Sequence, residues 1–198
     1  MQQLKKHQPS KNLLFVSKKI KKYLVMYQVE FITRILASKY KDCIDMGKVK
    51  YWNEVLLPVY VDESFDALSP NLVKALIASE SSFIVTTDRK DVPGDPRGLT
   101  QITEQTRSIL SNIHSPELHD YYTMLKADEL FDASANICAG VRWLFHKRHL
   151  LFNKQKRHPI TWDGAIANYK SAWREDIREQ NNTNAMVRFH EKYDWLMS

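Results

Sequence analysis

The stretch NLVKALIASESSF, residues 71–83, decides how this chain is organised. It is an apolar helical run whose last turn carries a glutamate, Glu80. Ser69 and Pro70 come directly before it, which is typical of an N-cap followed by the first helical residue. A second stretch, GLTQI at residues 98–102, follows after a polar loop that contains prolines. The sequence therefore predicts a helix with a defined start that sets one acid among apolar neighbours.

An acid in such a position suits one kind of chemistry. Apolar surroundings favour the neutral form of a carboxyl group, so Glu80 is expected to act as a proton donor. Cleaving a glycosidic bond near neutral pH requires a carboxylic acid that is still protonated there. The alternative reading, a solvated glutamate at the end of a surface helix, becomes less attractive because further motifs follow in a fixed order, at residues 136–144 and 167–169.

Four motifs occur in this order over residues 70–173: Glu80-Ser81, Gly98-Leu99-Thr100-Gln101, Asn136 with Gly140, and Asn168-Tyr169-Lys170. Together they resemble the lysozyme-like superfamily, and in particular the soluble lytic transglycosylase catalytic domain, which is related to goose-type lysozyme. The resemblance implies a mainly α, lysozyme-like fold of the α+β kind: a helical domain around a long central helix, with a small β-hairpin or loop beside the cleft. It also implies cleavage of the β-1,4 bond between N-acetylmuramic acid (MurNAc) and N-acetylglucosamine (GlcNAc) in peptidoglycan.

The resemblance also assigns roles to residues. Glu80 would protonate the leaving oxygen and then act as the base, while groups of the substrate itself supply the nucleophiles and leave a 1,6-anhydroMurNAc end. Tyr169 would point its hydroxyl at Glu80; the alternative is an aromatic residue of the helical core. Substrate contacts are implied for Ser81, Thr100, Gln101, Asn136 and Lys170.

Three residues depart from the family pattern. Thr100 stands where the family usually has methionine, which replaces a flexible apolar contact by a smaller polar one. Lys170 stands in the place of asparagine, and its ammonium would favour the carboxylate form of Glu80 if it reached that side chain. Ala172 replaces a glycine, so the helix is expected to continue beyond Tyr169. These departures motivate a second hypothesis, a catalytically silent peptidoglycan-binding module.

Residues 84–97 predict a small hairpin or long loop, because Val85-Thr86-Thr87 suits a short strand and aspartate, proline and glycine follow. Goose-type lysozymes have water-positioning aspartates in the corresponding region. Asp91 and Asp95 are therefore candidates for a second acid, which opens a hydrolytic, muramidase alternative. The other reading of these aspartates is turn formation.

The composition fits a folded soluble protein. The chain has 198 residues, of which 43% are hydrophobic and 26% charged. Its net charge of +6 is concentrated near the start, since residues 1–50 hold 12 basic and 3 acidic side chains. We expect a basic, amphipathic helical extension over residues 1–60, with a helix at 13–40, and a catalytic domain over 61–198. A basic surface that binds nucleic acid is a weaker alternative, because no aromatic and basic motif accompanies the charge.

Neither cysteine nor histidine spacing indicates a metal centre. Cys43 and Cys138 are the two cysteines, and they read as buried thiols or as one bridge in an oxidising compartment. We expect the activity to need neither a metal nor another cofactor.

The chain shows no signal peptide and no apolar run long enough to cross a bilayer. An enzyme with this substrate acts in the bacterial periplasm or cell wall, so a specialised secretion or injection apparatus, or excision from a longer chain, is expected to deliver it. The expected partners are peptidoglycan glycan strands and a cognate inhibitor or immunity protein; nucleic acid is not expected.

Turn and cap signals predict the remaining helices. They are expected at about residues 48–58, from Thr103 to Ser111, from Pro116 to Leu125, from Asp128 to about Phe152, from Thr161 to Trp173, and after Asn181–Thr183.

Overall fold

A computed structural model describes residue 44 and residues 48–60, 66–86, 93–111, 121, 123–155 and 160–198. Within these residues the protein is mainly helical, as predicted, and has no β-strand. The elements are α2 (Val49–Leu56), α3 (Pro70–Ser81), α4 (Glu104–Leu110), the short 3-10 helix η3 (Glu129–Phe131), α5 (Ala133–Gln155), α6 (Trp162–Tyr169), α7 (Ile177–Asn181) and α8 (Asn184–Met197).

Side-chain caps fix the starts of several helices where the sequence predicts them. Ser69 accepts a hydrogen bond from the backbone N–H of Asn71 at the start of α3. Thr103, Thr161 and Thr183 cap α4, α6 and α8 in the same way. Each such cap contributes about 1 kcal/mol to helix stability, because it pairs a backbone donor that the helix leaves open.

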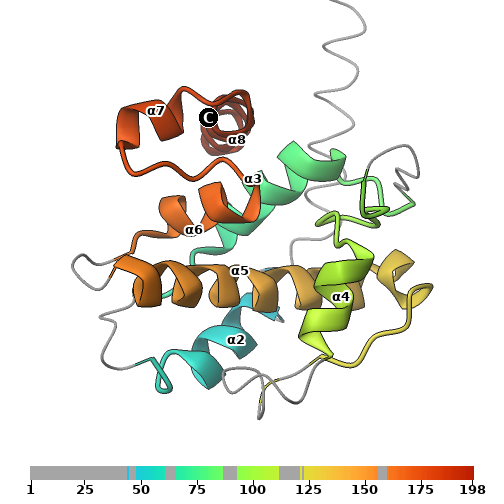
Figure 1. Cartoon of the computed structure of the whole chain (residues 1–198). Coiled ribbons are helices and arrows are strands. Elements are labelled where there is room, and N and C mark those ends of the chain that lie inside the picture. Colours follow the sequence, from blue (N-terminus) through green and yellow to red (C-terminus); the bar gives the residue numbers. More distant parts are fainter. Residues whose placement is uncertain are drawn as a thin grey trace, which may run out of the picture.

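Helix α5 runs through the middle of the molecule, with α2 on one side and α6 and α3 on the other, while α4 crosses its N-terminal half (Figure 1). Its apolar side chains Ile137, Val141, Leu144 and Phe145 are all buried. Arg148 is buried too, and its Nε donates to the carbonyl of Ile160 at 2.7 Å. The prediction of a central long helix is confirmed.

Helix α8 packs along α3, the helix that carries Glu80. Met186 and Phe189 of α8 are buried in the same core as Val73 and Leu76 of α3. The position of the Glu80 backbone therefore depends on residues far along the chain.

Helix α2, the described part of the predicted extension, shares the main core. Val49, Trp52 and Leu56 are buried in it, and Trp52 Nε1 donates to the carbonyl of Cys138 on α5 at 3.1 Å. Residues 48–60 thus contribute to the same core as the helices after residue 61. The helix predicted at 13–40 and Cys43 lie outside the described residues, so that helix and the Cys43–Cys138 bridge stay predictions.

Two local predictions fare differently from the helices. Val85 and Thr86, the described residues of the strand predicted at Val85-Thr86-Thr87, form a turn, and residues 87–92 lie outside the described part. Residues 123–126 are irregular, so a helix from Pro116 does not extend to Leu125 as predicted. Thr123 instead donates its backbone N–H to the carbonyl of Leu110 at 2.7 Å, which ties this segment to the end of α4.

Candidate active site

Glu80 lies in the last turn of α3, on the edge of the core. The helix ends in a left-handed residue, Ser82, with φ of 52°, and Phe83 follows at φ 63°. Phe83 is buried, and the chain turns away sharply there. The Glu80 side chain is 18% exposed, so it is partly desolvated as predicted and still reaches solvent.

Lys170 forms an ion pair with Glu80. Its Nζ contacts Glu80 Oε1 and also donates to Ser79 Oγ at 3.1 Å. The Lys170 side chain is 7% exposed, so this pair is more buried on the lysine side. The ammonium is therefore a counter-ion for the Glu80 carboxylate. Lys170, which stands where the resembled family has asparagine, therefore contacts the candidate acid Glu80 directly.

Asn136 is a structural residue and not the substrate contact that was predicted. It is wholly buried; its Oδ1 accepts from the Thr100 N–H at 2.7 Å, and its Nδ2 donates to the carbonyls of Arg97 and Leu130. The side-chain amide of Asn136 on α5 thereby holds the loop at residues 97–102 in place. Gly98 is required beside it, since a Cβ there would come within 2.2 Å of Asn136 Nδ2.

Thr100 is likewise turned inward and cannot touch a sugar in this conformation. Its side chain is wholly buried, and Oγ1 donates to Asn136 Oδ1 at 2.8 Å. It lies against Gly140, where an added Cβ would meet Thr100 atoms at 2.5 Å. A threonine side chain therefore fills the space beside Gly140, and a longer methionine at residue 100 would not fit there without a shift.

Ser81 also has a structural role. It is buried, and its hydroxyl lies 2.8 Å from the carbonyl of Leu99 and 3.2 Å from that of Ile77. These bonds join the end of α3 to the 97–102 loop. The predicted substrate contact is replaced by a bond that sets the loop beside Glu80.

Tyr169 donates its hydroxyl to the backbone carbonyl of Thr100 at 2.6 Å, and not to Glu80 as predicted. Burial, and then the nearby charge of Glu80, raise the pKa of the Tyr169 phenol above its usual range, while the bond to Thr100 lowers it. The phenol therefore stays neutral and keeps its role as a donor. Tyr169 is both a core aromatic, the alternative prediction, and part of the cavity wall.

Helix α6 ends at Tyr169, so the prediction that it continues beyond this residue is wrong. Ser171 adopts a left-handed conformation with φ of 56°, and the Ala172 N–H donates to the carbonyl of Ala167 at 2.7 Å. Since the left-handed residue is Ser171, the position of Ala172 does not require a glycine. This turn brings Lys170 beside α3.

Two adjoining cavities meet at the 97–102 loop. The first, of about 310 Å³, contains Glu80 in its wall; the second, of about 400 Å³, lies between α4 and α5. Both are lined by Gln101, Thr103, Tyr169 and Ser171. The first is also lined by Ser79, Pro93, Pro96, Lys170, Ala185 and Arg188. Of the predicted site residues, Glu80, Gln101, Tyr169 and Lys170 are brought together.

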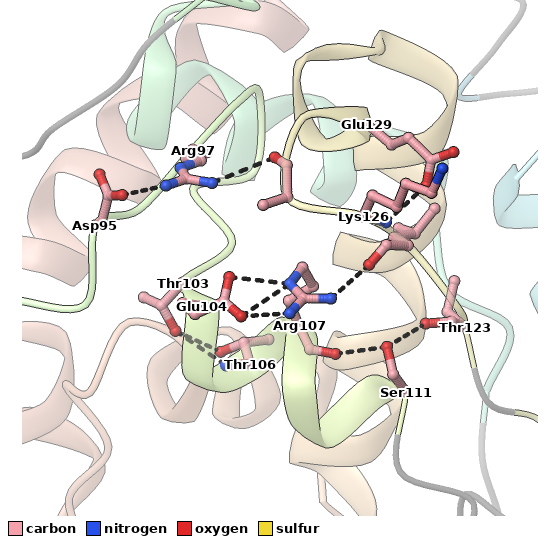
Figure 2. Close-up of polar contacts among 12 residues, drawn as sticks. Asp95, Arg97, Thr103, Glu104, Thr106, Arg107, Ser111, Thr123, Lys126 and Glu129 are labelled. Atoms are coloured by element: carbon pink, nitrogen blue, oxygen red, sulfur yellow. Dashed lines mark hydrogen bonds and ion pairs between the residues drawn. The ribbon is translucent and has the colours of Figure 1, made fainter.

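Asp95 is held away from this arrangement by an ion pair with Arg97, as Figure 2 shows. Arg97 Nη1 also donates to the carbonyl of Ala127 at 3.4 Å. Asp95 does not line either cavity, and Asp91 lies outside the described residues. Among the described residues Glu80 is the single carboxylate in the wall of the first cavity.

The second cavity contains residues that the sequence patterns did not single out as functional. Trp143, His146 and Lys147 line it from α5, and Arg188 reaches the first cavity from α8. The spacing i, i+3, i+4 of an aromatic and two basic side chains on one helix could have indicated a shared face. The apolar pattern of the same helix concealed it.

Comparison of the chain with protein-family models, with curated proteins and with solved structures found no match. In the described part of the chain, no group of three or more His, Cys, Asp or Glu residues lies where it could hold a metal ion. No helix among those residues is long and apolar enough to cross a membrane.

Proposed function

We propose that this protein cleaves the MurNAc–GlcNAc β-1,4 bond of peptidoglycan with Glu80 as the general acid and base, in the manner of a lytic transglycosylase on a lysozyme-like helical scaffold. One observation carries the proposal: Glu80, Gln101 and Tyr169, from three separately predicted motifs, line one cavity of about 310 Å³. Such a substrate lies in the bacterial periplasm or cell wall.

Counted over the described residues, the carboxylates at the cavity favour the transglycosylase reaction over hydrolysis. An inverting hydrolase needs a second carboxylate at roughly 6.5–9.5 Å to activate water. Asp95 is committed to Arg97, and no described carboxylate other than Glu80 lines the cavity. A transglycosylase needs one acid only, because the substrate's N-acetyl group and 6-hydroxyl complete the reaction. Glu80 would protonate the glycosidic oxygen and then accept the proton of the 6-hydroxyl.

Lys170 must leave Glu80, or pass it a proton, before the acid can act. Gln101 and Tyr169 line the same cavity, where a bound sugar would replace the water around the pair. A substrate that excludes this water strengthens the electrostatic interactions inside the cavity. The ion pair is therefore the feature that limits catalysis at neutral pH in this proposal.

The same ion pair favours a second candidate function, a peptidoglycan-binding module without turnover. A carboxylate held by a largely buried ammonium serves binding as well as it serves catalysis. This candidate predicts retention on sacculi with no release of soluble fragments.

Digestion of purified sacculi by the full chain, followed by mass spectrometry of the products, tests both candidates. Anhydro-muramic ends support the transglycosylase, reducing ends support a muramidase, and retention without release supports the binding module. Glu80→Gln is expected to slow release by about 10²–10⁴-fold, the usual contribution of a general acid. A rate within 3-fold of the parent would exclude Glu80 as the acid.

The control for this variant addresses its stability. Glu80→Gln leaves Lys170 without its carboxylate, so we expect a loss of about 2 kcal/mol, less than the ~3–5 kcal/mol of a fully buried pair because the amide still accepts a hydrogen bond. The double variant Glu80→Gln with Lys170→Met removes both charges and should regain most of that stability in urea unfolding. Its activity should stay as low as that of the single variant.

A further inference from the structure

The second cavity has the charge of a site for an anion. Among its described lining residues Lys147 is the one lysine, and no aspartate or glutamate is present. Thr106 and Ser171 contribute hydroxyls, and Ile109 and Leu150 contribute apolar surface. A volume of about 400 Å³ lies within the range of small-molecule sites.

Lys147 itself is in an unfavourable position without a ligand. Its Nζ lies 4.8 Å from the centre of the Trp143 ring, and it forms no ion pair with the described residues. Burial lowers the pKa of the Lys147 ammonium below its usual value, because desolvation penalises the charged form. A partly buried cation costs free energy unless an anion pairs with it. Cation–π contact with Trp143 offsets only part of that cost.

We propose that the second cavity binds a carboxylate group, with Lys147 as its charge partner. The ligand class is a short acidic peptide attached to the glycan, whose sugar chain occupies the adjoining Glu80 cavity; this source of the carboxylate rests on the proposed function. The two cavities share Gln101, Thr103, Tyr169 and Ser171, so a substituent on a sugar in the first enters the second directly.

The shape of the cavity argues against a second sugar there. Trp143 is 7% exposed, and its ring already stacks on the His146 ring, with centroids 4.9 Å apart. Lys147 contacts the same ring, so little aromatic surface remains for a pyranose to stack on. A single lysine with nearby hydroxyls supplies one positive charge, which matches the single charge of a carboxylate better than the charge of about −1.5 to −2 on a phosphate monoester.

Four probes test the site by calorimetric titration of the full chain. They are the disaccharide GlcNAc–MurNAc bearing an acidic tripeptide with a γ-linked D-glutamate, the same compound with its carboxylates amidated, the free acidic tripeptide, and a neutral GlcNAc tetramer. The disaccharide lacks the MurNAc–GlcNAc bond and is not cleaved. We expect the acidic disaccharide peptide to bind about 10-fold tighter than the amidated form, the scale of one charge-assisted hydrogen bond.

Matched variants assign that preference to one residue. Lys147→Met should abolish it and leave binding of the GlcNAc tetramer unchanged, whereas Lys147→Arg should keep part of it. Lys192→Met is the control, because Lys192 also lies over a tryptophan, Trp195, but lines neither cavity. It should keep the full preference. Thermal melts establish that each variant is folded.

The outcomes separate this inference from the proposed function. If Lys147→Met keeps the 10-fold preference, or if folded protein binds no acidic probe, the carboxylate site is wrong. If the GlcNAc tetramer binds and sacculi are cleaved while acidic and amidated probes bind equally, the carboxylate site fails and the proposed function stands. If the free tripeptide shows a Lys147-dependent preference but no glycan is bound or cleaved, the site stands and the proposed function fails.

Discussion

Lys170 and Lys147 line adjoining cavities, but only Lys170 has a carboxylate partner among the described residues. Lys170 pairs with Glu80 and is 7% exposed, whereas Lys147 has no carboxylate partner among the described residues. In the first cavity the chain supplies its own counter-ion, so a ligand must compete with an existing contact. In the second, a ligand can supply a missing one. Adjoining cavities of similar size can therefore have opposite responses to an anion.

Disrupting the wall that both cavities share should have the largest effect on stability and on ligand binding. Asn136→Ala removes the amide that holds the 97–102 loop, and leaves the buried Thr100 N–H and Leu130 carbonyl without this partner. We expect a loss of about 3 kcal/mol in urea unfolding and loss of binding in both cavities. Asn153→Ala, on an exposed position of the same helix, should change stability by less than about 0.5 kcal/mol. Equal stability of the two variants would contradict the structural role of Asn136.

Tyr169→Phe should have a smaller effect on the same wall. It removes the bond to the Thr100 carbonyl and should cost about 1–2 kcal/mol. Tyr193→Phe on α8, whose ring packs near Phe189, is the matched control and should be nearly neutral. If Tyr169 acts only through the loop, the Km for the glycan should rise and kcat should stay unchanged. A fall in kcat alone would indicate direct contact of the phenol with the reacting groups.

Lys170→Asn sharpens the comparison, because it removes the internal counter-ion of the first cavity. Without this ion pair Glu80 no longer has to leave Lys170 before it acts on the substrate, so we expect glycan release at neutral pH to rise about 3–10-fold. Lys154→Asn, which lies over Trp173 outside both cavities, is the control. Rates of release at pH 5 and pH 7 provide the measurement. Complete loss of activity would instead assign Lys170 a direct part in substrate binding.

Lys147→Met should have the smallest effect on stability, and the sign of that effect is informative. Burial lowers the pKa of Lys147 in the folded state, so the unfolded chain binds the proton more tightly. Stability should therefore rise with pH between the lowered pKa and the usual value near 10.5, and the variant should lack this rise. At neutral pH the variant should be more stable than the parent in urea. A less stable variant would mean that the ammonium already has a favourable partner.

The sequence predicted the helical framework well, because its signals are local. Ser69, Thr103, Thr161 and Thr183 mark helix starts through side-chain hydrogen bonds that span two or three residues. The end of α6 was missed, because the positive φ falls on Ser171, a residue that gives no glycine signal.

The site was predicted less completely, because its geometry depends on long-range contacts. Motif order groups Glu80, Gln101, Tyr169 and Lys170, and these four residues line one cavity. It could not tell which polar residues face inward: Asn136, Thr100 and Ser81 are buried by contacts 18 to 36 residues apart. The same limitation hid Lys147, whose importance lies in the lack of a nearby acid and not in any motif.

The contact between α8 and α3 has a consequence for biosynthesis. Residues 184–197 leave the ribosome long after the segment that bears Glu80, so the outer face of that segment remains uncovered while the intervening chain is made. Until Met186 and Phe189 arrive, the groove beside the acid lacks one of its supports. The wall of the Glu80 cavity is therefore complete only after residues 184–197, which include Ala185 and Arg188 of that wall, have been made.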